Sequence, residues 1–332
     1  MIEIAQIGCG YWGPNLLRNL SANPDCNVAM VCDQSAERQA YVKGLYPSTT
    51  VTNSPEDIFS NPDIQAVVIA TPVAMHFEHA MGALEAGKHI LVEKPMARTT
   101  QEVEAIAALA KEKNLIAMAG HTFLYNPAVH YLKSLVDSGE LGDIRYIYCR
   151  RLNLGKIRDD VDALWNLAPH DISIIQYLLD DQMPETIQRT GMDYLQNGID
   201  DVVFMNILYP NKVMAHVHVS WLDPAKVREI IVVGSKKMVV YDDMAESKIR
   251  IYDKGIDRIE SQDMDFDHQD YFSFNHRFGD ITLPRIPFVE PLKSEIGHFL
   301  NCIEGKETCR TDATHALGVV HILESASTKA GE

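Results

Sequence analysis

The chain has 332 residues, of which 46% are hydrophobic and 23% charged, as in an ordinary globular protein. Its formal net charge of −16 argues against a nucleic-acid-binding protein, and an anionic substrate would need a local basic site. The length predicts two domains, each with its own core. No apolar run reaches the length that spans a membrane.

The N-terminus and the cysteines bear on where the protein works. The chain enters a predicted strand at once, without the basic stretch and cleavage site of a secretory signal. The six cysteines are scattered and form no C-x-x-C pair. We therefore expect a cytoplasmic protein with reduced thiols.

A glycine motif follows the apolar residues 4–7 directly. Gly8, Gly10 and Gly13 form G-x-G-x-x-G, the strand–turn–helix pattern of dinucleotide-binding loops. The first glycine allows a tight turn, the second a close approach to a pyrophosphate, and the third close packing of the helix. Pro14 suits a first helical residue, and the N–H groups at that helix start favour phosphates.

A second apolar run, residues 28–32, ends at Asp33, twenty residues after Gly13. A carboxylate there can accept hydrogen bonds from the adenosine ribose and would repel a 2′-phosphate, which predicts NAD(H) rather than NADP(H). The alternative is a turn residue before Gln34 and Ser35. The spacing from the glycines favours the cofactor interpretation.

Strands and helices then alternate to about residue 120. Strands are predicted at 66–70, 89–93 and 115–119, and helices at 75–85 and from Thr99 to about Asn114. This alternation predicts an α/β fold with a doubly wound parallel sheet.

The pattern changes after Gly120 and His121. A helix is predicted at about 127–137, and strands at 144–151, 201–208, 213–221, 227–233 and 237–241, with a hairpin turn at Asn211-Lys212. Sequential strands with few helices between them predict an antiparallel sheet. We expect a long loop or arm at 253–287, and helices at 290–303 and 314–327.

Ligands of open α/β sheets bind beyond the carboxyl ends of the strands. Three sequence features lie there: Thr71-Pro72, Glu93-Lys94-Pro95 and Gly120-His121. Lys94 could orient a substrate hydroxyl, and partial desolvation would lower its pKa toward the range of proton transfer. On local sequence alone, a surface lysine before a proline turn is the better interpretation.

His170 follows Pro169, which fits a helix start with Ile172, Ile175 and Leu179 on one face. The imidazole would project from the helix N-terminus, where a neutral histidine can act as a general base. A capping or core histidine is an equally good interpretation.

Two further groups of residues could bind ligands. His216 and His218 share a strand face and could be half of a zinc site, but no further ligand stands nearby at suitable spacing, and we expect no metal site. A basic cluster could hold phosphate or carboxylate, although charges at a strand end are usually only solvated. The cluster consists of Arg150, Arg151, Lys156 and Arg158.

Together these motifs resemble the Gfo/Idh/MocA family, the relatives of glucose–fructose oxidoreductase and inositol dehydrogenase. The resemblance covers nearly the whole chain. It rests on the glycine motif, Ala70-Thr71-Pro72, Glu93-Lys94-Pro95, the run from Gly120 to Pro127, and the His170 segment. It implies a dinucleotide-binding Rossmann domain over 1–121 and an α+β domain over 122–332. The second domain would bind substrate and form a homodimer or homotetramer through an open sheet.

The resemblance also implies the chemistry: NAD(P)-dependent hydride transfer at a secondary alcohol or ketone, mostly of sugars and cyclitols. Lys94 matches the family's Glu-Lys-Pro lysine, and His170 matches its second-domain histidine, so both become candidate catalytic residues. In the implied reaction the nicotinamide takes the hydride, His170 accepts the hydroxyl proton and Lys94 hydrogen-bonds the same oxygen.

The expected site residues fall into two sets. Those expected to bind NAD are Gly8, Gly10, Tyr11, Trp12, Gly13, Asp33, Thr71, Pro72, His76, Glu93 and Lys94. Those expected to bind substrate are Lys94, His121, Tyr125, Arg151, Arg158, Trp165, Asn166 and His170.

The chain departs from the family pattern at two positions around His170. Many relatives have aspartate four residues before the histidine and three residues after it, where this chain has Asn166 and Ser173. Asn166 can hydrogen-bond a hydroxyl but cannot serve as a carboxylate base. Asp162 and Asp171 become candidates for a supporting role.

Residues 158–173 and 219–224 resemble a subgroup associated with nucleotide-sugar and surface-polysaccharide pathways. Its typical reaction oxidises the 3-hydroxyl of a UDP-N-acetylglucosamine-type sugar, and the basic cluster would suit such a diphosphate. Three alternatives stay open: a free-sugar or inositol dehydrogenase, an NAD-dependent glycosidase, and a non-catalytic NAD-binding regulator.

Overall fold

The computed structural model describes residues 1–259 and 273–327, and the chain forms two compact units. Unit 1 contains Met1–Asn126, Ile172–Asp181 and the residues from Val289 onward. Unit 2 contains Pro127–Asp171 and Gln182–Phe288. This division differs from a single boundary at 121/122, because the two C-terminal helices belong to unit 1.

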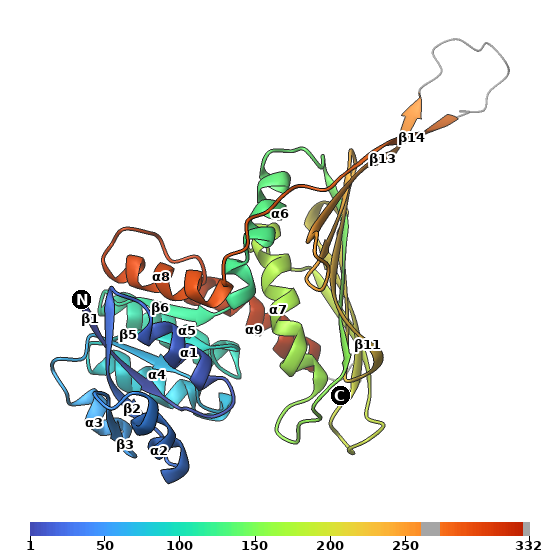
Figure 1. Ribbon diagram of the computed structural model, residues 1–332. Coiled ribbons are helices and arrows are strands. Elements are labelled where there is room, and N and C mark those ends of the chain that lie inside the picture. Colours follow the sequence, from blue (N-terminus) through green and yellow to red (C-terminus); the bar gives the residue numbers. More distant parts are fainter. Residues whose placement is uncertain (260–272, 328–332) are drawn as a thin grey trace, which may run out of the picture. The chain divides into compact units, whose positions relative to one another are not determined.

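Unit 1 is built on a parallel sheet (Figure 1). Its strands are β1 (Ile2–Ile7), β2 (Cys26–Cys32), β3 (Thr50–Thr52), β4 (Ala66–Ile69), β5 (His89–Glu93) and β6 (Ala117–Gly120), in the order β3-β2-β1-β4-β5-β6. β4 consists of four apolar residues that are all buried, as expected for a strand covered on both faces. The predicted doubly wound sheet is confirmed.

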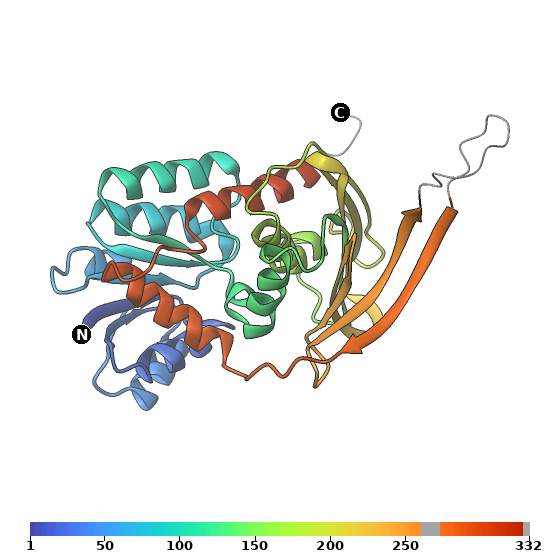
Figure 2. The ribbon, with the colours of Figure 1, turned by 90° about the horizontal axis from the view of Figure 1, so that it is seen from above.

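Helices cover both faces of this sheet. They are α1 (Gly13–Ser21), α2 (Ala36–Leu45), α3 (Pro55–Phe59), α4 (His76–Glu85), α5 (Thr100–Glu112), α8 (Pro291–Ile303) and α9 (Ala313–Ser327), with short 3₁₀ turns η1 (Val73–Met75) and η2 (Thr122–Tyr125). Figure 2 shows α4, α5 and α9 on one side of the sheet and α1 and α8 on the other. Thr99 caps α5 by accepting a hydrogen bond from the Glu102 N–H at 3.2 Å. The strand order reverses between β1 and β4, which is where sheets of this kind bind ligands.

Unit 2 contains a mixed sheet. Its strands are β7 (Ile144–Leu154), β8 (Thr186–Met192), β9 (Val202–Tyr209), β10 (Val213–Ser220), β11 (Leu222–Gly234), β12 (Met238–Asp242), β13 (Ile249–Ile259) and β14 (Ser273–Thr282). The order is β14-β13-β12-β11-β7-β10-β9-β8. Among the described residues of this sheet, only β7 and β10 pair in parallel, and the other neighbouring strands are antiparallel. The mostly antiparallel sheet is therefore confirmed, and β8 is a strand that the sequence analysis missed.

The hairpin turn between β9 and β10 lies where it was predicted, in the 3₁₀ turn η3 (Pro210–Lys212). Asn211 and Lys212 both have φ of 61°, the left-handed conformation of tight hairpin turns. Tyr209 then pairs with Val213, and this pairing sets the register of the two strands.

One face of the unit 2 sheet is covered and the other is open. α6 (Pro127–Asp137) packs against β12, and Figure 1 shows no helix of unit 2 on the opposite face of the sheet among the described residues. Buried and exposed residues alternate along β9, as expected for a half-covered sheet. On the open face Tyr146, Phe204, Leu208 and Met214 are each between 42% and 44% exposed.

Two predictions about this unit need correction. The helix α7 (Ala163–Leu178) begins before Pro169, because the Asp162 carboxylate accepts the Trp165 N–H at 2.9 Å and caps the helix. His170 therefore lies inside a helix and not at its N-terminus. The expected loop or arm at 253–287 is largely two paired strands, β13 and β14. The part of it at 260–272 lies outside the described residues.

Within the described residues, no helix is long and apolar enough to cross a membrane.

Candidate active site

The glycine loop between β1 and α1 has the geometry of a phosphate cradle. Gly8 has φ of 93°, and a Cβ atom there would lie 2.6 Å from the carbonyl oxygen of Ala70. A Cβ at Gly13 would lie 2.7 Å from the Gly8 carbonyl oxygen. A Cβ at Gly10, in contrast, would meet nothing within 4 Å. The first and third glycines are required by packing, whereas the second borders open space that a pyrophosphate can fill.

The start of α1 adds donors to this cradle. Its N-cap residue, Trp12, makes no capping hydrogen bond with its side chain, and Pro14 lies in the first turn. The free N–H groups of a helix start attract anions. Tyr11, at the tip of the loop, is 88% exposed.

Asp33 ties the end of β2 to the glycine loop. One carboxylate oxygen accepts the Cys9 N–H at 2.7 Å, and the other accepts the Ser35 N–H at 2.9 Å. Each oxygen keeps a lone pair for a ligand hydroxyl. The bond to Cys9 was not foreseen from the sequence, and it fixes the carboxylate beside the loop.

His76 joins the loops that follow β4 and β5. Its Nδ1 lies 2.9 Å from the Pro95 carbonyl oxygen, and its Nε2 lies 2.9 Å from the Thr71 carbonyl oxygen. Burial lowers the pKa of His76, against the two carbonyl oxygens, which raise it. Both ring nitrogens are turned to the backbone, and His76 positions these loops for a ligand. The buried hydroxyl of Thr71 has no hydrogen-bond partner among the described residues, which leaves it available to a ligand.

Five titratable residues gather at the carboxyl ends of β5 and β6, and we call them the strand-end cluster: Glu93, Lys94, His121, Glu295 and His315. Glu93 accepts the backbone N–H of half-buried Lys94 at 3.2 Å. It also accepts a hydrogen bond from the Trp12 side chain.

Burial raises the pKa of both carboxyl groups of the strand-end cluster. Burial raises the pKa of Glu93 to about 7, against the opposing charge of Lys94. Burial also raises the pKa of Glu295 well above its usual value, and the Glu93 charge adds to the effect. The Glu295 carboxyl is hydrogen-bonded to the Thr122 hydroxyl at 2.8 Å. Glu93 can therefore gain or lose a proton near neutral pH, and the pKa of Glu295 is shifted in the same direction.

His121 is the neutral histidine of the strand-end cluster. Burial lowers its pKa well below 6.5, and the charges of His315 and Lys94 lower it further. In the described part of the chain neither ring nitrogen has a hydrogen-bond partner. The ring meets the edge of His315 at 5.4 Å between centroids, and His315 Nδ1 lies 2.6 Å from the Asp181 carboxylate. His121 can therefore donate or accept a hydrogen bond to a ligand.

The sequence analysis found only part of this cluster. Glu295 and His315 come from α8 and α9, about 170 or more residues after the strands that they join. No local sequence pattern identifies them, because a single glutamate or histidine on an amphipathic helix cannot be distinguished from an ordinary surface or core residue.

The second candidate catalytic residue, His170, lies on α7 and is half-buried. Asn166 precedes it by one helical turn and so shares its face of the helix. The Asn166 side-chain oxygen accepts the Trp221 indole N–H at 3.2 Å, which orients the amide. Trp165 is half-buried beside it.

The basic cluster of unit 2 is largely paired with carboxylates. Buried Arg151 makes two parallel hydrogen bonds to buried Asp171, at 2.8 and 2.9 Å. The expectation that Arg151 binds a substrate anion, and that Asp171 supports His170, is therefore corrected, because each charge already neutralises the other. Arg158 also bonds Asp160, at 2.7 and 2.5 Å, but it is 41% exposed and can still reach a ligand.

Tyr125 also differs from its expected role. It is 1% exposed, and its hydroxyl lies 3.0 Å from the Thr311 hydroxyl. Its hydroxyl instead fastens the loop between α8 and α9 to η2, so it is engaged within the protein, whereas the ring nitrogens of His121 have no hydrogen-bond partner among the described residues.

Two family models match the chain. A model described as "Oxidoreductase family, NAD-binding Rossmann fold" matches residues 2–121, and one described as "GFO/IDH/MocA C-terminal domain" matches residues 129–240.

Curated relatives share between 24% and 32% of the aligned residues. A 4-carboxy-2-hydroxymuconate-6-semialdehyde dehydrogenase of Sphingobium is 30% identical over 184 residues, covering 53% of this chain and 58% of that one. A UDP-N-acetylglucosamine 3-dehydrogenase of Acidithiobacillus ferrooxidans is 32% identical over 200 residues, covering 58% and 59%. The chain spans about six tenths of the length of the curated relatives it matches.

The crystal structure of the Acidithiobacillus ferrooxidans enzyme superposes with a TM-score of 0.83 at 23% identity. The superposition covers 98% of this chain and 96% of that chain. At this identity the likeness establishes the fold.

Proposed function

Because the chain belongs to the Gfo/Idh/MocA family of NAD(P)-binding oxidoreductases, we propose that it is a dehydrogenase of a sugar's secondary hydroxyl group. The observation that carries this proposal is the strand-end cluster. At the carboxyl ends of β5 and β6 it brings together half-buried Lys94 and His121, whose ring nitrogens have no hydrogen-bond partner among the described residues. It also contains two carboxyl groups with raised pKa, those of Glu93 and Glu295. A non-catalytic regulator would have no use for these buried groups, whose desolvation is costly.

The residues present fit a bound dinucleotide. The open space at Gly10 and the free start of α1 suit the pyrophosphate, Asp33 suits the ribose hydroxyls, and the Thr71 hydroxyl is available near the Gly8 turn. Such a cofactor supplies hydride transfer when it is bound.

In the proposed reaction Lys94 donates a hydrogen bond to the substrate hydroxyl and stabilises the negative charge that grows on its oxygen. His170 accepts the proton of that hydroxyl. His121 hydrogen-bonds the substrate as a neutral ring. Glu93 holds the Lys94 backbone in place.

For the substrate we propose a nucleotide sugar of the UDP-N-acetylglucosamine type, oxidised at C3. Support comes from the 32% identity to a UDP-N-acetylglucosamine 3-dehydrogenase and from residues 158–173, with exposed Lys156 and half-buried Arg158 as the members of the basic cluster that solvent reaches. A free-sugar or inositol dehydrogenase is the second candidate, because Arg150 and Arg151 are paired with carboxylates and leave less positive charge for a diphosphate.

The test is NADH formation from NAD with UDP-N-acetylglucosamine, glucose or myo-inositol, with a 3-aminotransferase and an amino donor present to remove a 3-keto product. Turnover of the nucleotide sugar alone supports the proposal. Turnover of a free polyol assigns the protein to the second candidate. Sugar conversion without net NADH would indicate a glycosidase.

The Lys94→Ala variant tests the proposed role of Lys94. We expect its turnover to fall at least about a hundredfold, as for loss of a transition-state donor, while NADH still binds in fluorescence titration. Near-normal turnover would remove Lys94 from the mechanism.

We further propose NAD(H) as the cofactor. The Asp33→Ala variant should bind NAD(H) more weakly and discriminate less against NADP(H), because the carboxylate no longer repels a 2′-phosphate. Arg38→Ala is the control, since Arg38 is a half-buried residue near this loop that could pair with such a phosphate. If Arg38→Ala weakens NADPH binding in the wild-type background more than Asp33→Ala weakens NADH binding, the preference is for NADP(H).

The open face of the unit 2 sheet supports the proposal of a homodimer or homotetramer. Four large apolar side chains are exposed there on adjacent strands, and such patches usually mark interfaces. Light scattering of the wild type and of Phe204→Arg tests this. A charge within the patch should dissociate the oligomer.

A further inference from the structure

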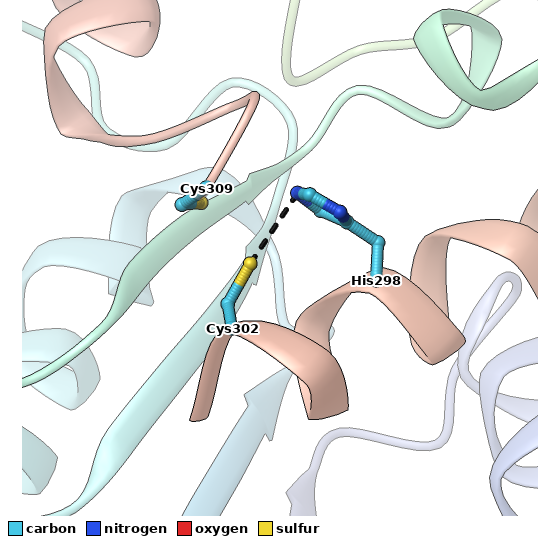
Figure 3. Close-up of side chains that lie close together, drawn as sticks. All are labelled: His298, Cys302 and Cys309. Atoms are coloured by element: carbon cyan, nitrogen blue, oxygen red, sulfur yellow. Dashed lines mark hydrogen bonds between the residues drawn. The ribbon is translucent and has the colours of Figure 1, made fainter. Parts of the chain in front are cut away.

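Three potential metal ligands lie close together at the end of α8 (Figure 3). His298 and Cys302 are one helical turn apart on α8, and Cys309 comes from the loop that joins α8 to α9. The ligand atoms of all three lie within 4.8 Å of one another. All three residues belong to unit 1, and the mechanism proposed above uses none of them.

The spacing of these atoms matches a tetrahedral zinc centre. Zinc–sulfur and zinc–nitrogen bonds with a tetrahedral angle between them separate S and N by about 3.6 Å and two sulfurs by about 3.8 Å. The Cys302 Sγ already lies 3.4 Å from the His298 Nε2. An ion could therefore enter with shifts of a few tenths of an ångström in this pair.

The imidazole of His298 is held in the form that binds zinc. Its Nδ1 is hydrogen-bonded to the Glu307 carboxylate, whose other oxygen accepts the Asn301 amide at 2.7 Å. The Arg310 backbone N–H donates to Nε2 at 3.0 Å, so Nε2 carries the lone pair and Nδ1 the proton. A carboxylate on the far nitrogen of a ligating histidine is the usual support of a zinc site. On binding, the ion would take the place of the Arg310 N–H.

Burial and charge also suit zinc. His298 and Cys302 are buried and Cys309 is half-buried, so the group is partly shielded from water yet open on one side. Two thiolates neutralise the charge of Zn²⁺, and sulfur with imidazole nitrogen is the donor set that zinc prefers.

We propose that His298, Cys302 and Cys309 bind one Zn²⁺ ion, with water in the fourth position. The ion would fasten α8 to the loop before α9. This loop also joins β6, because the Thr311 carbonyl oxygen accepts the Ala119 N–H at 2.7 Å. The site would thus stabilise the segment that leads into His121, and it is independent of the proposed activity.

Cobalt(II) titration of the full chain, reduced and stripped of metal with a chelator, tests the proposal. We expect saturation at one equivalent, with a thiolate-to-cobalt charge-transfer band and the strong visible bands of tetrahedral cobalt. Cys302→Ser and Cys309→Ser should lose the charge-transfer intensity. Cys26→Ser should keep it, since Cys26 is a buried thiol of the same unit that only donates to the Leu20 carbonyl.

Glu307→Gln tests the support of His298 and should weaken binding about 10- to 100-fold. A second measurement on the wild type avoids variants that fail to fold. Bound Zn²⁺ should raise the melting temperature and protect Cys302 and Cys309, but not the other cysteines, from alkylation followed by mass spectrometry. Absence of a cobalt spectrum from the reduced wild type, or an unchanged spectrum in both serine variants, overturns the proposal.

Discussion

Replacing Glu93 by glutamine should change how the stability of the protein depends on pH. Burial raises the pKa of this carboxyl from 4.5 to about 7. The unfolded chain releases the proton near pH 4.5, whereas the folded chain holds it to about pH 7. Between these values the folded state binds more protons, so stability is fully present below pH 4.5 and is lost as the pH rises toward 7.

The size of the effect follows from the shift. Each pKa unit corresponds to about 1.4 kcal/mol, so the full loss is about 3 kcal/mol. Between pH 5 and pH 8 the Glu93 contribution should fall by about 2.5 kcal/mol, most of it below pH 7.

Urea unfolding of the wild type and of Glu93→Gln at half-unit steps from pH 5 to pH 8 measures this contribution. The glutamine still accepts from the Lys94 N–H, but its amide leaves a new donor at a buried position that has no partner among the described residues. That cost is independent of pH. The test is therefore how the difference in unfolding free energy between the two proteins changes with pH, and not its absolute size. Glu104→Gln, on the exposed face of α5, controls for removing a charge.

A difference in unfolding free energy between wild type and Glu93→Gln that stays constant across this range would contradict the raised pKa of Glu93. A difference that rises with pH would contradict it too, since the folded state would then favour the carboxylate.

Further substitutions test the cofactor loop and the arginine pairs. Gly8→Ala should prevent stable folding, because its φ is positive and its Cβ would strike a carbonyl oxygen, whereas Gly10→Ala should melt like the wild type and bind NADH more weakly in fluorescence titration. Arg151→Ala should cost about 3–5 kcal/mol in urea unfolding, because it leaves Asp171 as an unpaired buried charge, and a loss below about 1 kcal/mol would contradict the buried pair. Arg158→Ala breaks an exposed pair and should cost less than about 1 kcal/mol, while raising KM for a nucleotide sugar and not for a free sugar.

The nucleotide-binding half could be predicted because its signals are local. The glycines, the apolar runs and the Thr99 cap each lie within one strand, turn or helix start, and the structure has these elements close to the expected residues. The hairpin at Asn211 is equally local, since its conformation is set by two residues.

The remainder depends on contacts between distant segments. Arg151 and Asp171 are 20 residues apart, on a strand and a helix, and neither sequence neighbourhood indicates a pair. Glu295 and His315 join His121 only through the packing of the C-terminal helices. Pro169 gave a wrong helix start because proline is common at that position, yet here the Asp162 cap begins the helix at Ala163, six residues earlier.

The discontinuity of unit 1 has a consequence for protein synthesis. The parallel sheet emerges from the ribosome first, but α8 and α9, which pack on α1 and on α5, are made only after unit 2. Until then the faces of α1 and α5 that these helices cover remain exposed, and the nascent sheet cannot reach its final stability. Folding of the nucleotide-binding half therefore waits until unit 2 and these two helices have been made, and truncation after Phe288 should leave an aggregation-prone protein even though every glycine-loop residue is present.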